Sequence, residues 1–478
     1  MANSKAVKRP LPWSLNLGQR RTLLVIGDFF MAILALGISL LYWGSNLVYL
    51  KFGLTFLETR VPTWFYLLPF VWVILLVDLY SIHRAADWRH TLRGVATAAV
   101  VGLGLYLVMY VIYVEPPNSF LPRRGIAGFL IAASLLTLLW RRVYIQIFTA
   151  PQLMRRVLLV GGGMTGQILL KIVNGMHPKP FHIVGIIDDD QQKQNILIEG
   201  HVVLGTSEHL LELVAENDIA ELIIAISGEM RGSMFQALLD AQEQGVEIIR
   251  MPVAYEELLG RVPIRWLEAD WILRSFVDEA RPRGFYELAK RLVDIIGGLV
   301  GTLLMLLFLP FVALAVILDD GLPIFYTQIR SGKGDVPYRM IKIRTMHRDA
   351  EPNGTPMRAS DGDPRTTRIG RILRKIRLDE LPQFINVLRG EMSLVGPRAE
   401  RPELVNHYQK NIPFYRARLL VKPGATGWAQ VNFGYASNID ETSLKLEYDL
   451  YYIKHRSAIL DFVICLRTPF TMLGLRGR

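Results

Sequence analysis

The stretch LVDIIGGLVGTLLMLLFLPFVALAVILDDG, residues 292–321, decides how this chain is arranged around a membrane. It exceeds the ~20 residues that a helix needs to cross a hydrocarbon core. Pro310 lies in its interior, where it removes a backbone donor and kinks a helix. A crossing helix would put the residues before and after it on opposite faces. A helix that breaks at Pro310 and returns would keep them on one face, and the residues alone leave both topologies open.

The first third of the chain has the composition of a membrane domain. Of the 478 residues, 51% are hydrophobic and only 20% are charged, which indicates membrane segments rather than disorder. Four apolar runs, at about 22–44, 64–82, 95–114 and 126–146, approach the length of a span. We therefore predict a four-helix transmembrane bundle over residues 1–150. Asp28 and Asp78, inside these runs, are expected to lie near a helix end or to face a partner helix; a functional intramembrane acid is the alternative.

Basic residues beside these runs predict that both ends of the bundle lie in the cytosol. Arg123 and Arg124 oppose the pattern but are outnumbered. The residues that support it are Lys5, Lys8, Arg9, Arg20, Arg21, Arg84, Arg89, Arg93, Arg141, Arg142, Arg155 and Arg156.

A Rossmann-like α/β domain is predicted for residues 151–280. RRVLLVGGGMTGQILLKIV (155–173) has the pattern of a strand, a glycine-rich turn and a helix, and FHIVGIIDDD (181–190) that of a second strand ending in acids. Gly161, Gly163 and Gly166 have dinucleotide-binding spacing, and Asp188 to Asp190 fall about where a ribose-binding acid would lie. The turn could equally be structural, serve self-association as a homodimer, or bind an unidentified nucleotide.

Charge and cysteine content limit the classes of partner. A net charge of +11 suits nucleic acid, an anionic membrane surface or phosphorylated substrates. No zinc-finger or aromatic RNA-binding signature is present, so a lipid bilayer and phosphate are predicted and nucleic acid is not. The single cysteine, Cys465, excludes an intrachain disulfide and a multi-cysteine metal site.

The chemistry is predicted within RKIRLDELPQFINVLRGEMSLVGPR, residues 374–398, where Asp379 and Glu380 stand among cations. Arginine forks suit phosphate oxygens. One carboxylate could hold Mg²⁺ against a pyrophosphate, and the other could attack phosphorus. A solvated helix start, with acids near the positive end of the dipole, fits the same residues. The surrounding cations are Lys333, Lys342, Arg344, Arg365, Arg368, Arg371, Arg374, Lys375, Arg377 and Arg398.

From about Arg283 onward the chain resembles the bacterial sugar transferase family, the polyprenyl-phosphate sugar-1-phosphate (phosphoglycosyl) transferases. The blocks KRLVDIIGG, YRMIKIRTM, DPRTTRIGRILRK, LDELPQFINVLRGEMSLVGPR and KPGATGWAQVN occur in the family's order. The upstream spans and α/β domain resemble its large members, such as undecaprenyl-phosphate glucose or galactose phosphotransferases. The resemblance implies transfer of a sugar 1-phosphate from a UDP-sugar to undecaprenyl phosphate with release of UMP. That reaction is the first membrane step of exopolysaccharide, capsule or O-antigen synthesis.

The resemblance also implies roles for individual residues. Asp379 becomes the nucleophile of a ping-pong reaction, and Glu380 acts with the Mg²⁺-bound phosphate, so both are expected metal ligands. Arg377 departs from the family, which commonly has a small hydroxyl residue there. The expected substrate-binding residues are Lys342, Arg344, Arg365, Arg368, Arg371, Arg374 and Arg398.

The implied fold is a membrane α-helical bundle, an α/β (Rossmann-like) domain and an α/β catalytic domain, residues 281–478, with a re-entrant membrane helix at about 292–320. Pro310 would be the vertex of that helix, and Lys290 and Arg291 would lie near anionic headgroups. The implied location is the bacterial inner (cytoplasmic) membrane, as a multi-pass protein with the catalytic domain on the cytoplasmic face.

Two alternatives belong to other functional classes. Tyr286 and Lys290 have the YxxxK spacing of short-chain dehydrogenases, which would suit a membrane-bound nucleotide-sugar dehydratase or oxidoreductase. A non-catalytic scaffold for polysaccharide assembly is the other alternative.

Overall fold

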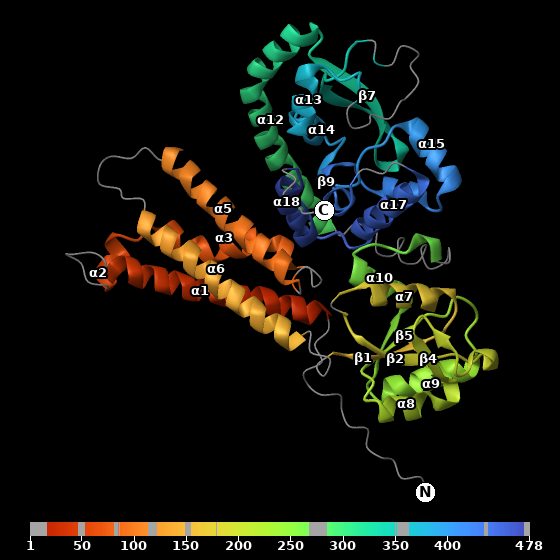
Figure 1. Cartoon of the computed structure of the whole chain (residues 1–478). Helices are drawn as coiled ribbons and strands as arrows, with labels where there is room; N and C mark the ends of the chain where they lie inside the picture. The colour runs from red at the N-terminus through yellow and green to blue at the C-terminus, as the bar shows by residue number, and fades with distance from the viewer. Residues whose placement is uncertain are drawn as a thin grey trace. The chain divides into compact units, whose positions relative to one another are not determined.

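The computed structural model forms two compact units, residues 1–258 and 259–478 (Figure 1). The residues it describes are 17–45, 53–80, 85, 87–112, 122–148, 154–177, 179–266, 284–348, 350, 363–434 and 438–472. Four of the basic residues used to predict orientation lie outside this description, namely Lys5, Lys8, Arg9 and Arg84.

The first unit begins with a helical bundle in which three of the four predicted spans are continuous helices. These are α1 (Leu17–Ser45), α5 (Trp88–Ile112) and α6 (Arg123–Phe148). The prediction of one continuous span over 64–82 was wrong, because this run is split. Pro62 caps a short helical stretch, Thr63–Leu75, and non-helical Leu76 separates this stretch from η2 (Val77–Tyr80). The short elements of the bundle are α2 (Leu54–Thr59), η1 (Thr63–Leu67), α3 (Leu68–Leu75) and η2 (Val77–Tyr80).

A buried ion pair ties this split run to the long helices. Asp28 of α1 accepts a hydrogen bond from Arg141 of α6 at 2.6 Å, and both side chains are 0% exposed. Arg141 also donates to the carbonyl of Leu79 at 2.9 Å, which satisfies a backbone group near the end of the split run. Asp28 therefore faces a partner helix, which is one of the two placements predicted for it.

The second part of the first unit is an α/β domain with a six-stranded sheet in the order β3-β4-β2-β1-β5-β6. The pairs within β4-β2-β1-β5-β6 are parallel, and β3 is an antiparallel edge. Buried aliphatic side chains of β1, β2 and β5 pack against α8 and α9. The strands are β1 (Arg156–Val160), β2 (His182–Ile187), β3 (Leu197–Ile198), β4 (His201–Gly205), β5 (Glu221–Ile224) and β6 (Glu247–Arg250), and the helices are α7 (Met164–Gly175), η4 (Gln191–Lys193), η5 (Ser207–His209), α8 (Leu210–Glu216), α9 (Gly232–Glu243) and α10 (Met251–Leu259).

The second unit carries the acidic pair and a large core formed by α15, α17, α18 and the segments between them. Val262 and Ile264 belong to this core, and the Val262 N–H donates to the carbonyl of Glu447 at 3.1 Å. The boundary predicted at residue 280 therefore lies too late. The elements are η6 (Ile264–Trp266), α12 (Gly284–Asp320), β7 (Phe325–Ser331), η7 (Lys333–Asp335), β8 (Pro337–Ile343), α13 (Arg368–Lys375), η8 (Leu378–Glu380), α14 (Gln383–Arg389), β9 (Ser393–Val395), α15 (Pro402–Asn411), η9 (Tyr415–Leu420), β10 (Gly424–Thr426), α16 (Trp428–Asn432), α17 (Ile439–Lys454) and α18 (Ala458–Met472).

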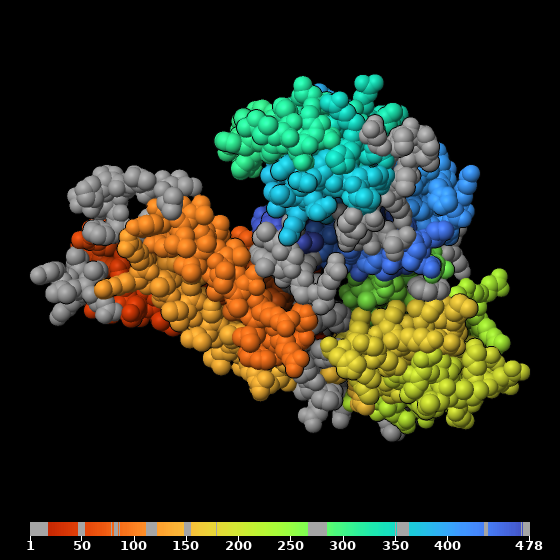
Figure 2. Space-filling model, turned by 45° about the horizontal axis from the view of Figure 1, so that its top comes forward, coloured from red at the N-terminus to blue at the C-terminus, as the bar shows by residue number. Residues whose placement is uncertain are grey.

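Helix α12 runs along this unit as one long curved helix of 37 residues (Figure 1). It continues through Pro310, so the break expected at this residue is absent from α12. Its first half packs closely on the unit, because a Cβ on Gly301 would lie 2.3 Å from the ring of Phe384. Its second half packs Val312 and Val316 against Ile343 and Leu373. In Figure 2 the green surface of α12 continues into the blue surface of the residues that follow it. By length and composition, the described helices able to cross a membrane are Gly18–Ser45, Trp88–Tyr110, Arg123–Ile147 and Gly284–Asp320.

Candidate active site

The acidic pair lies on a tight turn between α13 and α14. Asp379 and Glu380 are the last two residues of η8, which Arg377 precedes with a left-handed φ of 60°. Such a conformation costs a non-glycine residue roughly 1–3 kcal/mol and is often found at functional sites. The turn directs the pair inward, and Asp379 is only 7% exposed.

Glu380 is neutralised by three cations that converge on one oxygen. Its Oε1 lies 3.3 Å from Lys342 Nζ, 3.1 Å from Arg398 Nη2 and 3.5 Å from Arg377 Nη1. Burial raises the pKa of Glu380, but the three cations outweigh burial and hold the pKa well below its ordinary value. Glu380 is therefore charged and held in place at any physiological pH.

Asp379 has the opposite environment. Its Oδ1 is buried and has no hydrogen-bond partner among the residues described. Burial raises the pKa of Asp379, and the neighbouring charge of Glu380 raises it further, although nearby cations act in the other direction. A carboxylate oxygen without a hydrogen-bond partner, within a positive surrounding, can attack phosphorus or bind a metal ion.

The cations around Glu380 come from separate elements. Lys342 lies on β8, where it is opposite Tyr326 of β7. Arg398 follows β9, and its backbone bridges to Gly424 at the start of β10. The carbonyl of Arg398 also accepts a hydrogen bond from Arg418 at 2.9 Å.

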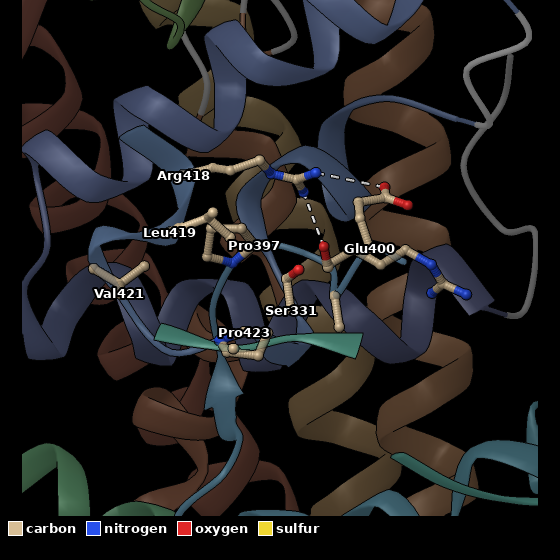
Figure 3. A pocket seen from close by; sticks show the side chains of 10 residues that line it. Ser331, Pro397, Glu400, Arg418, Leu419, Val421 and Pro423 are labelled. Atoms are coloured by element: carbon tan, nitrogen blue, oxygen red, sulfur yellow. Dashed lines mark hydrogen bonds and ion pairs between the residues drawn. The ribbon is translucent and has the colours of Figure 1, made fainter. Parts of the chain in front are cut away.

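Arg418 anchors that loop from within a buried charge network (Figure 3). Arg418 Nη2 lies 2.9 Å from Asp449 Oδ2, and Nη1 lies 3.5 Å from Glu400 Oε1. Arg418 and Glu400 both line a small pocket, together with Ser331 and Pro397 (Figure 3). Burial raises the pKa of Glu400, but Lys445 and Arg418 outweigh it and lower the pKa to about 2. Sequence reasoning missed this network, because its acids and cations are far apart along the chain and carry no local pattern.

Three other predicted substrate-binding cations have partners outside the acidic pair. Arg344 is paired with Asp320 at the end of α12, at 2.9 Å. Arg365 forms two side-chain hydrogen bonds to Asp363, at 2.9 and 2.6 Å. Arg374 donates to Thr345 Oγ1 at 2.9 Å, although its charge still acts on Asp379.

Arg368 and Arg371 lie on the exposed face of α13. The same face carries Ile372 and Ile376, which are 57% and 52% exposed. This combination of cations and exposed apolar side chains is typical of a surface that lies on a membrane.

Lys290 and Arg291, in the first turns of α12, are hydrogen-bonded to protein groups. The sequence had instead predicted that both residues lie near anionic headgroups. Lys290 Nζ lies 2.9 Å from Asp461 Oδ2, and Tyr286 donates to the same oxygen at 2.9 Å. Arg291 donates to the carbonyls of Val387 and Leu388 at the end of α14, at 2.8 and 2.7 Å. Helix periodicity did not show that this polar face meets protein. Because Tyr286 and Lys290 are both used in this contact, the dehydrogenase alternative gains nothing from their spacing.

The space around the glycine turn of the α/β domain is occupied by other residues of the same domain. Gly161 has a φ of 105°, and a Cβ on Gly166 would lie 2.1 Å from the carbonyl oxygen of Gly161, so both glycines are required for the turn itself. Gly163 caps α7. Asp188 accepts a hydrogen bond from the N–H of Gly162 at 2.8 Å.

Further contacts close the same turn. Lys193 lies 3.1 Å from Asp188, and a Cβ on Gly162 would meet Ile198 of the β3 edge at 2.8 Å. In the usual dinucleotide arrangement the glycine N–H groups face the pyrophosphate and the acid binds the ribose. Here the two bind each other, so these residues favour a structural role.

The donor set around Asp379 fits Mg²⁺ bound together with a substrate. The described residues contain no group of three or more metal-ligating side chains. Mg²⁺ commonly needs only one or two carboxylates when phosphates and waters supply the other ligands. The unpartnered Oδ1 of Asp379 is suited to this, whereas Oε1 of Glu380 is already surrounded by cations.

Comparison with known proteins gives two families for different parts of the chain. Residues 285–474 match the family described as bacterial sugar transferase, and residues 76–252 match one described as CoA-binding domain. The second match covers the glycine turn, whose Gly162 N–H and Asp188 are already engaged with each other.

Three relatives illustrate the first match. The UDP-N-acetylgalactosamine-undecaprenyl-phosphate N-acetylgalactosaminephosphotransferase of Aeromonas hydrophila is 41% identical over 46% of this chain and 50% of its own length. The UDP-glucose:undecaprenyl-phosphate glucose-1-phosphate transferase of Xanthomonas campestris is 31% identical over 58% of this chain and 57% of its own. A protein of the same name from Caulobacter vibrioides is 40% identical over 40% of this chain and 72% of its own. The chain thus spans about half the length of the first two relatives.

Proposed function

Because the chain belongs to the bacterial sugar transferase family, we propose that it transfers a sugar 1-phosphate from a UDP-sugar to undecaprenyl phosphate, releasing UMP. The observation that carries this proposal is the contrast between the two acids. Glu380 is neutralised by three cations, while Asp379 is buried beside them without a partner for its Oδ1 among the described residues. Adjacent carboxylates in opposite environments divide their roles.

In the first half-reaction a carboxylate oxygen of Asp379 attacks the β-phosphorus of the donor. The bond between that phosphorus and the bridging oxygen breaks, and UMP leaves with the electron pair. Lys342, Arg377 and Arg398 hold Glu380 in place and add positive charge beside the diphosphate. Mg²⁺, when bound, would neutralise the diphosphate and the leaving UMP.

In the second half-reaction an oxygen of undecaprenyl phosphate attacks the acyl phosphate. The bond between phosphorus and Asp379 breaks, the carboxylate is regenerated, and a polyprenyl-diphosphate-linked sugar is released. The product would begin the membrane steps of an exopolysaccharide, capsule or O-antigen. This division of one transfer into two steps is the usual use of a nucleophilic carboxylate.

We also propose that α12 is re-entrant and holds this site on the cytoplasmic face of the inner membrane. Helix α12 is hydrogen-bonded to one unit both in its first third and at its end. Asp294 accepts from the N–H of Leu394 at 2.8 Å, and Asp319 accepts from the N–H of Ile369 at 2.9 Å. A crossing helix would separate its ends by about 30 Å of hydrocarbon. The outer face of α12 is apolar over its length, with Leu303 and Phe311 65% and 73% exposed, which suits contact with lipid.

UMP release from a panel of UDP-sugars, with undecaprenyl phosphate present, tests the activity. A donor labelled with ³²P at the β-phosphate should label the protein when the acceptor is left out. Asp379→Asn should abolish both turnover and labelling. Labelling that persists in this variant would remove Asp379 from the role of nucleophile, and absence of UMP release with every donor would refute the proposed activity.

A further inference from the structure

Asn386 is a fully buried amide whose hydrogen bonds join the strand carrying Lys342 to the helix that follows the acidic pair. It lies on α14 and is 0% exposed. Its Oδ1 accepts from the N–H of Ile341 at 3.1 Å, and its Nδ2 donates to the carbonyl of Arg339 at 2.8 Å. Nδ2 also donates to Glu391 Oε2 at 2.7 Å, so both sides of the amide are used.

The amide takes the place of a third strand. Within the described part of the chain β8 pairs only with β7, so its other edge has no neighbouring strand there. In an antiparallel pair, alternate residues direct their N–H and C=O groups away from the partner strand. Arg339 and Ile341 are such residues of β8, and the Asn386 amide binds the C=O of one and the N–H of the other. A residue of a neighbouring parallel strand would make the same two bonds.

This contact fixes the position of β8 next to Lys342, the residue of β8 that contacts Glu380. Lys342 follows Ile341 directly, and its Nζ reaches Glu380 at 3.3 Å. Asn386 lies six residues after Glu380, on the helix that the acidic turn leads into. A shift of β8 along α14 would therefore move Lys342 relative to both acids.

We propose that Asn386 is a positioning residue for the transfer reaction: its side-chain amide locks β8 onto α14 and so holds the Lys342 ammonium against Glu380. The proposal rests on the function proposed above for the acidic pair. An amide is needed because one atom must accept and the other must donate. The carboxylate introduced by Asn386→Asp would present an oxygen to the Arg339 carbonyl and to Glu391. Asn386→Ala would leave the Arg339 C=O and the Ile341 N–H unpaired.

A double-mutant cycle on the full chain in nanodiscs tests the action through Lys342. Asn386→Ala should lower kcat/KM by about 10- to 100-fold, since misplacing a catalytic group by about 1 Å can cost about 10²-fold. In a Lys342→Met background the same substitution should change kcat/KM by less than about threefold, because the effects of residues that act as one unit are not additive. Two effects that simply multiply would overturn the proposal. Asn411→Ala, at an exposed asparagine whose side chain donates within its own helix, is the matched control.

A labelling measurement reads the position of Lys342 without any turnover, so it separates this proposal from the proposed activity. Limited acetylation followed by mass spectrometry gives the reactivity of Lys342 relative to the exposed Lys410. Asn386→Ala should raise that ratio by about 5- to 10-fold, the order expected when two hydrogen bonds are lost. An unchanged ratio would overturn the proposal even if activity falls.

Asn386→Asp covers the case in which the alanine variant does not fold. The aspartate is isosteric and keeps the acceptor for the Ile341 N–H, and at low pH its protonated form regains one donor. The Lys342 labelling ratio of this variant should therefore approach the wild-type ratio as pH falls and rise as pH increases. A ratio that does not change with pH would contradict the proposed clamp.

Discussion

Replacing Glu380 with glutamine should destabilise the second unit, because it removes the one charge that three cations share. The carboxylate oxygen Oε1 lies within 3.5 Å of a nitrogen of Lys342, Arg377 and Arg398. Glutamine keeps the shape and one acceptor oxygen but leaves three positive charges facing one another. Removing one partner of a buried ion pair typically costs about 3–5 kcal/mol.

The lower end of that range applies, since the Glu380 side chain is 17% exposed and solvent screens part of the charge. A loss of about 3 kcal/mol in a domain of about 150–250 residues lowers the melting temperature by about 6–12 °C. The direction in which the stabilisation by Glu380 changes with pH follows from its pKa. The pKa of Glu380 is depressed in the folded protein, so its stabilisation is present above the ordinary glutamate pKa and is lost as pH falls through the depressed value.

Thermal unfolding of detergent-solubilised protein at neutral pH, followed by tryptophan fluorescence, measures the effect. Glu403→Gln is the matched control, because Glu403 is exposed in the first turn of α15. The control should shift the melting temperature by no more than about 1–2 °C, as for an ordinary surface change. If Glu380→Gln melts like the control, the three cations do not converge on Glu380 as described.

Three further outcomes are expected. On the proposed mechanism the ionised form of Asp379 is the nucleophile; because burial raises its pKa, kcat/KM should then fall as pH drops through a value above the ordinary 3.8, and Glu380→Gln should move this acid limb to lower pH. Pro310→Leu should restore the backbone donor that proline lacks inside α12 and shift part of the population toward a crossing topology, measured by the side from which Lys333→Cys and Glu243→Cys react in a Cys465→Ser background; wild-type positions that react from opposite sides would exclude a re-entrant α12. Asp188→Ala should lower the stability of the α/β domain by about 1–3 kcal/mol without any ligand, since it removes the acceptor for the Gly162 N–H; an unchanged melting temperature would instead favour an acid reserved for a nucleotide.

The sequence predicted those features that local pattern encodes. The glycine-rich turn between β1 and α7 was visible because a strand, three glycines and a helix follow one another directly. Asp379 and Glu380 were visible because their motif is contiguous, and the motif blocks also marked Lys342 and Arg398, which contact Glu380. The long apolar helices were predicted because membrane length imposes a simple rule on composition.

The remaining features depend on contacts between distant residues. Arg344 and Arg365 read as phosphate ligands in a basic segment, but each pairs with an acid that the local pattern does not single out as its partner. Lys290 and Arg291 flank an apolar run, which suggested headgroups, yet the fold places protein carbonyls and Asp461 beside them. The split in the second apolar run falls at Leu76, where no proline or glycine marks it in the sequence.

The distribution of charge around the acidic pair explains why so basic a segment contains a reactive acid. If every cation were free, Asp379 would form its own ion pair and lose its reactivity toward phosphorus. Arg344 and Arg365 are instead held by Asp320 and Asp363, and the cations nearest the pair converge on Glu380. The local field thus stays positive enough to attract a diphosphate while Oδ1 of Asp379 keeps no partner among the described residues. On the proposed mechanism, this field would draw the diphosphate of an anionic donor to the carboxylate that attacks it.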